Sequence, residues 1–116
     1  MKNNAIYKYK TYCELVIVTD GISPEEITRE TQIKPYRQFI KGEIFRAKTS
    51  GSEGKRANNL WAIKSDTIIS EVEDISAHIQ YFRNIFKNKV GVFQKLKTDE
   101  KNKLNFWIWI EVDEVG

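Results

Sequence analysis

Few residues of this chain could carry out covalent chemistry, since it has one cysteine, Cys13, and one histidine, His78. Nucleophilic catalysis needs a thiol or hydroxyl with a base within hydrogen-bond reach. Cys13 falls inside an apolar run that predicts a strand, whereas His78 falls beside the apolar stripe of a predicted helix. We therefore interpret Cys13 as a buried structural cysteine and His78 as a residue at the boundary of the core. The sequence predicts no catalytic residue, and we expect a protein that is not an enzyme.

Neither a metal site nor a phosphate-binding loop is indicated by residue spacing. One histidine and one cysteine cannot form a structural zinc site. The acids Glu71, Glu73 and Asp74 fall in a predicted first helical turn, where negative charge complements the helix dipole. Segment 51–56, Gly-Ser-Glu-Gly-Lys-Arg, has two residues between its glycines where a phosphate-binding loop has four, and arginine follows its lysine. We expect no metal and no cofactor.

The run from 105 to 113 near the C-terminus is the strongest indication of a binding surface. If it forms a strand, the apolar even-numbered residues from 106 to 112 share one face, and Trp107 and Trp109 share the other. If the even-numbered face packs on helices, both tryptophans lie on the outer side of the sheet. Tryptophan is enriched in binding hot spots, so we predict that Trp107 and Trp109 bind a protein partner. The alternative is a strand buried on both sides, or covered by Tyr7 and Tyr9.

A last strand in the sequence is also a candidate sheet edge, which invites pairing with another chain. The same run therefore suggests a homodimer through this C-terminal edge strand.

Charge is unevenly distributed along the chain, although the net charge is only +3. Residues 34–64 carry eight Lys or Arg against two acids, for a net charge of +6, whereas residues 98–116 carry two lysines against five acids. Such asymmetry can steer a partner toward one face. Four basic residues of a predicted hairpin join the candidate binding residues: Lys41, Arg46, Lys55 and Arg56.

A single-stranded nucleic-acid-binding module is the alternative function. Tyr36, Phe39, Phe45 and Trp61 are interleaved with the basic residues, and exposed sheet aromatics can stack on bases. The aromatic signature typical of that module is absent, however, and a net charge of +3 gives modest counterion release. A solvated hairpin with no partner is the simplest alternative to both.

Composition indicates one domain over residues 1–116, with 41% apolar and 30% charged residues. No apolar run approaches the roughly 20 residues that span a bilayer, and residues 1–8 lack the apolar region of a signal peptide. A single cysteine agrees with a reducing compartment. We expect a cytoplasmic protein without membrane contact.

Periodicity and capping predict the elements that position these residues. Ser23 and Ser70 each precede a glutamate by three residues, which is a capping box at a helix start. Apolar residues at three-and-four spacing predict the longer helix; they are Val72, Ile75, Ile79, Phe82 and Phe86. The full prediction is strand 5–19, helix 24–32, strand 36–47, loop 48–59, strand 60–63, helix 70–88, and strands 90–96 and 104–112.

This order is βαββαββ, which predicts an α+β fold: a ferredoxin-like βαββαβ order with an extra C-terminal strand, and an antiparallel sheet with two helices on one face.

Four short segments carry a family resemblance: Gly-Ile-Ser-Pro-Glu-Glu-Ile-Thr (21–28), Thr-Gln-Ile-Lys-Pro (31–35), Lys-Gly-Glu (41–43) and the tryptophan of Leu-Trp-Ala-Ile (60–63). With them the chain resembles the bacterial domain-of-unknown-function family 4279, over roughly residues 12–95. The resemblance implies a small bacterial, phage or mobile-element protein and carries over no activity, cofactor or catalytic residue. From this family context we expect a protein that binds another macromolecule, most concretely an immunity or inhibitor protein that neutralises a toxin or defence component.

Overall fold

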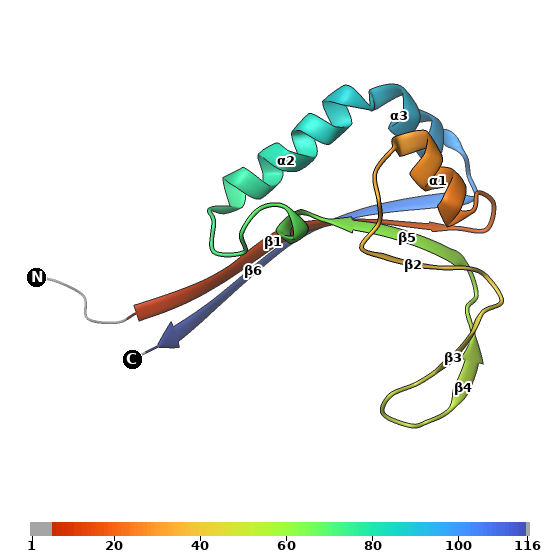
Figure 1. Cartoon of the computed structure of the whole chain (residues 1–116), viewed down its shortest axis with the longest axis horizontal. Coiled ribbons are helices and arrows are strands. Elements are labelled where there is room, and N and C mark those ends of the chain that lie inside the picture. The colour runs from red at the N-terminus through yellow and green to blue at the C-terminus, as the bar shows by residue number, and fades with distance from the viewer. Residues whose placement is uncertain (1–5, 116) are drawn as a thin grey trace, which may run out of the picture.

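The computed structural model describes residues 6–115, and the side chains of residues 10–112. In chain order the elements are β1 (Ile6–Thr19), α1 (Pro24–Thr31), β2 (Arg37–Phe39), β3 (Ile44–Arg46), β4 (Glu53–Lys55), β5 (Asn59–Lys64), a short 3-10 helix (Ser65–Thr67), α2 (Ile75–Asn88), α3 (Val90–Thr98) and β6 (Asn102–Val115). The fold is α+β. Its antiparallel sheet has the order β2-β5-β1-β6, and β3 and β4 form a separate hairpin. Figure 1 shows the three α-helices on one side of the sheet and the hairpin on the other.

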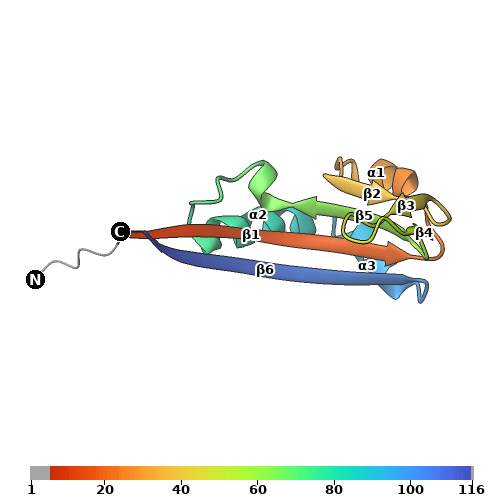
Figure 2. The same ribbon diagram turned by 90° about the horizontal axis from the view of Figure 1, so that it is seen from below.

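The central strand β1 has two neighbours of unequal length. β6 pairs with β1 along all of Ile6–Thr19, whereas β5 pairs with β1 only from Glu14 to Thr19. Residues 6–13 of β1 and 108–115 of β6 therefore form a two-stranded ribbon, called the arm below, which Figures 1 and 2 show projecting from the body. The radius of gyration is 17.4 Å, whereas a compact chain of this length has about 13 Å.

The main core lies between the sheet and the helices. Its buried members are Cys13, Leu15, Ile17, Ile27, Trp61, Ile63, Phe82, Phe93 and Leu96. A smaller cluster lies on the opposite face, which we call the outer face: Val16, Leu60 and Ala62, with Val18 and Phe39 against it. Both faces of β1 are thus apolar near its end, which fits its central place in the sheet.

Residues 90–96, predicted as a strand, are helical in the structure. Phe93 and Leu96 of α3 are both buried in the main core, and their spacing of three is one turn of helix. Lys95 and Lys97 lie in the last turn, where they complement the helix dipole. The alternation of Val90 and Val92 therefore does not mark a strand. The prediction of a strand at 90–96 is wrong, as is the prediction of two helices.

The longer helix starts later than its predicted capping box. Asp74 is the N-cap of α2, and its side chain accepts a hydrogen bond from the backbone N–H of Ser76. Ser70 instead lies in the preceding turn, and Val72 is 64% exposed rather than on the buried stripe. The capping box at Ser23 is borne out in part, because the Ser23 hydroxyl accepts from the Glu26 N–H at the start of α1.

The predicted strand 36–47 is interrupted at Gly42, whose φ of 91° is in the left-handed region. The interruption separates β2 from β3, so that the chain leaves the main sheet and forms the hairpin. Within the predicted loop 48–59, residues 53–55 form β4. The remaining strand predictions, 5–19, 60–63 and 104–112, each fall within two or three residues of an observed strand.

Candidate functional site

The two tryptophans of β6 lie on the outer face. Trp109 is paired with Tyr12 and Trp107 with Glu14, and directly opposed residues share a face of an antiparallel sheet. Phe106, on the other face, packs edge-on against Phe82 of α2 with ring centroids 5.0 Å apart. The predicted division of the strand into two faces is therefore confirmed, and Trp107 and Trp109 are 58% and 47% exposed. The side chains of Tyr7 and Tyr9 lie outside the described ones.

An aromatic strip continues from these tryptophans across the outer face. Tyr12 stacks on Trp109 with centroids 6.0 Å apart and planes 13° from parallel. The ammonium group of Lys64, on β5, lies 4.1 Å from the Tyr12 ring centroid and 5.4 Å from that of Tyr36. We call Trp107, Trp109, Tyr12, Lys64 and Tyr36 the outer strip. A cation over aromatic faces is attracted by their quadrupoles, which holds the strip together.

Glu14 holds Tyr36, the last residue of the outer strip, in place. The Tyr36 hydroxyl donates a hydrogen bond to the Glu14 carboxylate, and the Arg37 guanidinium lies 3.9 Å from it. Burial and this carboxylate raise the pKa of Tyr36, so the phenol stays protonated and remains a donor.

Tyr12 and Lys64 were absent from the candidates chosen by sequence. The alternation of β1 places Tyr12 opposite to Cys13, but only the strand register places it beside Trp109. No sequence signal gave that register.

Two of the four basic candidate residues, Lys41 and Arg46, form ion pairs within their own chain. The Arg46 guanidinium contacts Glu53 at 3.0 Å, and the Lys41 ammonium contacts Asp20 at 3.5 Å. Lys55 is exposed.

Arg56 lies between two rings, with its guanidinium carbon 4.0 Å from the Phe39 centroid and 4.1 Å from the Phe45 centroid. It therefore links the hairpin to the sheet.

The structure does not bring the two predicted groups of binding residues together. Trp107 and Trp109 lie on β6 at one edge of the sheet, and the hairpin follows β2 at the other edge. Of the aromatic residues proposed for base stacking, Phe39 and Phe45 lie together around Arg56, whereas Trp61 lies elsewhere. Trp61 is fully buried on the helix side, where its indole N–H donates to the Thr28 hydroxyl at 3.0 Å.

His78 is fully buried, so its interpretation as a boundary residue was wrong. Its Nε2 lies 3.0 Å from the carbonyl oxygen of Ser70, which can only accept, and its Nδ1 lies 2.6 Å from Ser65 Oγ. Ser65 Oγ in turn accepts the backbone N–H of Cys13 at 2.8 Å. Serine beside histidine could suggest a nucleophile and its base, but both side chains are fully buried. The arrangement is a satisfied core network that joins β1 to α2.

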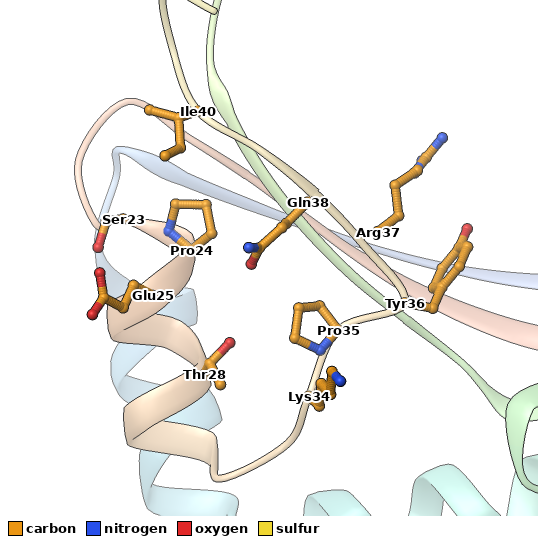
Figure 3. A pocket seen from close by; sticks show the side chains of 10 residues that line it. All are labelled: Ser23, Pro24, Glu25, Thr28, Lys34, Pro35, Tyr36, Arg37, Gln38 and Ile40. Carbon is orange, nitrogen blue, oxygen red and sulfur yellow. The ribbon is translucent and has the colours of Figure 1, made fainter.

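A hollow of about 470 Å³ lies between α1 and the segment leading into β2 (Figure 3). Thr28 and Gln38 point toward it, while Tyr36 and Arg37 point away from α1. The three hydroxyls among its lining residues all make structural hydrogen bonds, since Ser23 caps α1, Thr28 accepts from Trp61 and Tyr36 donates to Glu14. Its lining therefore offers space and no activated nucleophile.

Among the described residues, no group of three or more His, Cys, Asp or Glu side chains is placed to hold a metal ion. None of the helices in this part of the chain has the length and apolar character needed to cross a membrane.

Comparison with known families gives one match. The chain belongs to the family described as Domain of unknown function (DUF4279), whose model matches residues 8–114. No curated protein and no solved structure matches the chain.

Proposed function

We propose that this DUF4279 protein is a non-enzymatic binding protein of the immunity or inhibitor type, from a bacterium or phage, which neutralises a toxin or defence component by direct contact. The observation that carries the proposal is the exposure of Trp107 and Trp109 on a regular strand. Leaving two indoles in water forgoes the free energy of burying them, and a partner protein recovers it.

One of the two tryptophans is held in place before any partner arrives. Trp109 is stacked on Tyr12, and Tyr12 is in contact with the ammonium group of Lys64. A side chain that is already ordered loses less entropy when it is buried in an interface, so more of the contact energy appears as affinity.

Charged groups surround the apolar centre of this surface. Lys103 and Glu111 are exposed on the outer face of β6, and Glu14 and Lys64 lie on the neighbouring strands. An apolar centre with a polar, mixed-charge rim is the usual composition of a protein interface. The partner that fits is a protein with apolar pockets for two indoles and mixed charge around them.

The immunity assignment can be tested through the neighbouring genes. We expect one of their products to inhibit growth of a host cell, and co-expression of this chain to restore growth. Trp107→Ala with Trp109→Ala should abolish the rescue. Ile68→Ala with Val72→Ala is the matched control, because it removes two exposed apolar side chains from another surface. Rescue that is equal in both double variants would exclude the tryptophans as the binding site.

Nucleic-acid binding remains the second candidate, favoured by the exposed Lys48 and Lys55 of the hairpin segment. Phosphate contacts would make affinity for single-stranded RNA or DNA fall steeply with salt. Lys55→Glu with Arg56→Glu should abolish such binding, but Arg56 also packs on two rings. Lys48→Glu with Lys55→Glu changes charge and keeps that packing, so it is the sharper variant. Absence of binding at about 50 mM salt would remove this candidate.

For the fold, we also propose a ferredoxin-like arrangement with the β3–β4 hairpin as an insertion. Its support is that β1-α1-β2 and β5-α2-α3-β6 are both strand–helix–strand units, each with another strand of the sheet between its two strands. The strand order and helix placement in a solved structure of another family member would test it.

A further inference from the structure

The free backbone edge of β6, on the side away from β1, belongs to a long strand with many apolar residues. Among residues 6–115, no strand pairs with this edge, and Figure 2 shows β6 as the outermost strand of the sheet. From 104 to 110 every residue except Asn105 is apolar, and Lys103 and Glu111 flank the run. Proteins usually protect such edges with charge, proline or a bulge, since the free backbone groups otherwise pair with another strand.

A hollow of about 370 Å³ adjoins the same strand on the helix side. Leu104 and Phe106 of β6 line it together with Val90 and Phe93 of α3. The hollow lies near the N-terminal end of β6. Leu104 and Phe106 pair with the half of β1 that also pairs with β5, so this end of β6 lies within the body.

The arm has the complementary surface. Ile108 and Ile110 lie on the helix side of β6, as Phe106 does, but beyond it, and they are 52% and 57% exposed. On the other side of the arm, the β1 edge is bonded to the body, since the Thr11 N–H donates to the Glu71 carbonyl oxygen at 2.8 Å, whereas no described strand pairs with the β6 edge. One end of β6 therefore has an apolar hollow, and the other end has exposed apolar side chains.

We propose that two copies of this chain pair through their β6 edges, antiparallel around a two-fold axis at Trp107. In this register Phe106 faces Ile108 of the second copy and Leu104 faces its Ile110. Each arm then lays its two isoleucines beside the hollow of the other copy and gains a third strand. The two four-stranded sheets join into one, and the interface is self-complementary, as a two-fold axis requires.

Charge complementarity between the two copies favours this register. With the axis at Trp107, Lys103 lies opposite Glu111 of the second copy, and both side chains are exposed on the outer face. Directly opposed charges of opposite sign stabilise an antiparallel pair. The proposal goes beyond the proposed function, because Ile108, Ile110 and the free edge of β6 are not part of the partner surface. The two proposals share Trp107, Lys103 and Glu111 on the outer face, and Ile108→Lys tests the pairing alone.

Sedimentation equilibrium of the full chain tests the pairing. The wild type should have twice the 13.6 kDa mass of one chain. Ile108→Lys places a charge beside the two-fold axis and should raise the dimer dissociation constant at least about tenfold. Ile68→Lys, at an exposed position far from β6 in the sequence, is the matched control and should leave the dimer intact. A wild type with the mass of one chain, or a dimer equally stable in Ile108→Lys, would overturn the proposal.

Cysteine crosslinking tests the register without relying on a destabilising change. Two copies of Trp107→Cys would face each other at the axis, within the roughly 4.4–6.8 Å between Cα atoms that a disulfide spans. Two copies of Trp109→Cys would be four strand positions apart, or roughly 13 Å. Native Cys13 is buried and should not compete. Mild oxidation should crosslink the first variant alone, and crosslinking of Trp109→Cys in preference would contradict this register.

The charge pair gives a third readout in the same experiment. Lys103→Glu and Glu111→Lys should each weaken the dimer, because either change places like charges opposite each other. The double variant, Lys103→Glu with Glu111→Lys, is made together with Lys10→Glu, because Lys10 lies opposite Glu111 within each chain. It restores opposite signs and should recover the wild-type dissociation constant. Failure of the double variant to recover it would show that these residues are not opposed.

Discussion

Phe82 holds the helix side of the sheet together. Its ring is 1% exposed and contacts the rings of Tyr81, Phe86 and Phe106, so it joins α2 to β6. Phe82→Ala should lower the free energy of unfolding by about 3–5 kcal/mol, because the ring is lost and a cavity remains. Chemical denaturation measures this change.

Val72→Ala is the informative control for that measurement. The apolar spacing placed Val72 on the same buried stripe as Phe82, but the structure leaves it exposed before α2 begins. Its substitution should change stability by no more than about 0.5 kcal/mol. Equal losses in the two variants would mean that the helix starts where the sequence pattern placed it.

Ser65 is the centre of the buried network. Ser65→Ala removes the acceptor of the Cys13 N–H and the partner of His78 Nδ1, and leaves both groups buried. An unsatisfied buried polar group costs about 1–3 kcal/mol, so the denaturation midpoint should fall clearly. Ser52→Ala, in the exposed hairpin, is the control and should have little effect. An unchanged midpoint for Ser65→Ala would show that the network does not stabilise the fold.

Cys13 and His78 show which buried side chains could be predicted from the sequence. Burial of Cys13 was predictable, because alternating apolar residues surround it. Burial of His78 was not, because it depends on two oxygen atoms that the fold brings from Ser65 and Ser70. A polar side chain is buried when its partners are in place, and partners distant in space leave no local pattern.

Among the elements, long strands and the first helix were predictable and the segment after α2 was not. β1 and β6 have sustained alternation, and α1 has a serine cap that functions as predicted. Residues 90–96 have apolar positions compatible with both a strand and a helix, and burial of Phe93 and Leu96 decides for the helix. The outer strip was predictable at Trp107 and Trp109, but its partners depend on the register between β1 and β6.

The β3–β4 hairpin depends on Arg56 for its attachment. Arg56 lies between Phe39 of the sheet and Phe45 of the hairpin, and Gly54 allows the Phe45 ring to approach closely. Arg56→Ala should leave the main sheet folded and increase hydrogen exchange in β3 and β4, because both ring contacts are lost. Arg56→Lys keeps a cation and should have a smaller effect. Unchanged exchange in Arg56→Ala would show that the hairpin is ordered by its own hydrogen bonds.

At the scale of the whole molecule, the helices, the basic hairpin and the exposed tryptophans lie in three different places on the sheet. The helices cover one side of the sheet, the basic hairpin lies at the β2 edge, and the exposed tryptophans lie at the β6 edge. The predicted charge asymmetry therefore becomes a spatial one, with the hairpin and the acidic C-terminal run on different strands. The arm adds an extended shape that no composition or periodicity indicated, because it results from the unequal lengths of β5 and β6.

The most direct test of the account is a calorimetric titration of the full chain with its partner protein, identified among the products of the neighbouring genes. Trp107→Ala with Trp109→Ala should keep the backbone signal of the far-UV circular dichroism spectrum, because both indoles lie on the outer face. It should weaken partner binding by about 2 kcal/mol or more, which is roughly a 30-fold rise in the dissociation constant. A double variant that unfolds would place these tryptophans in the core, and one that is folded and binds with unchanged affinity would contradict the proposed binding surface.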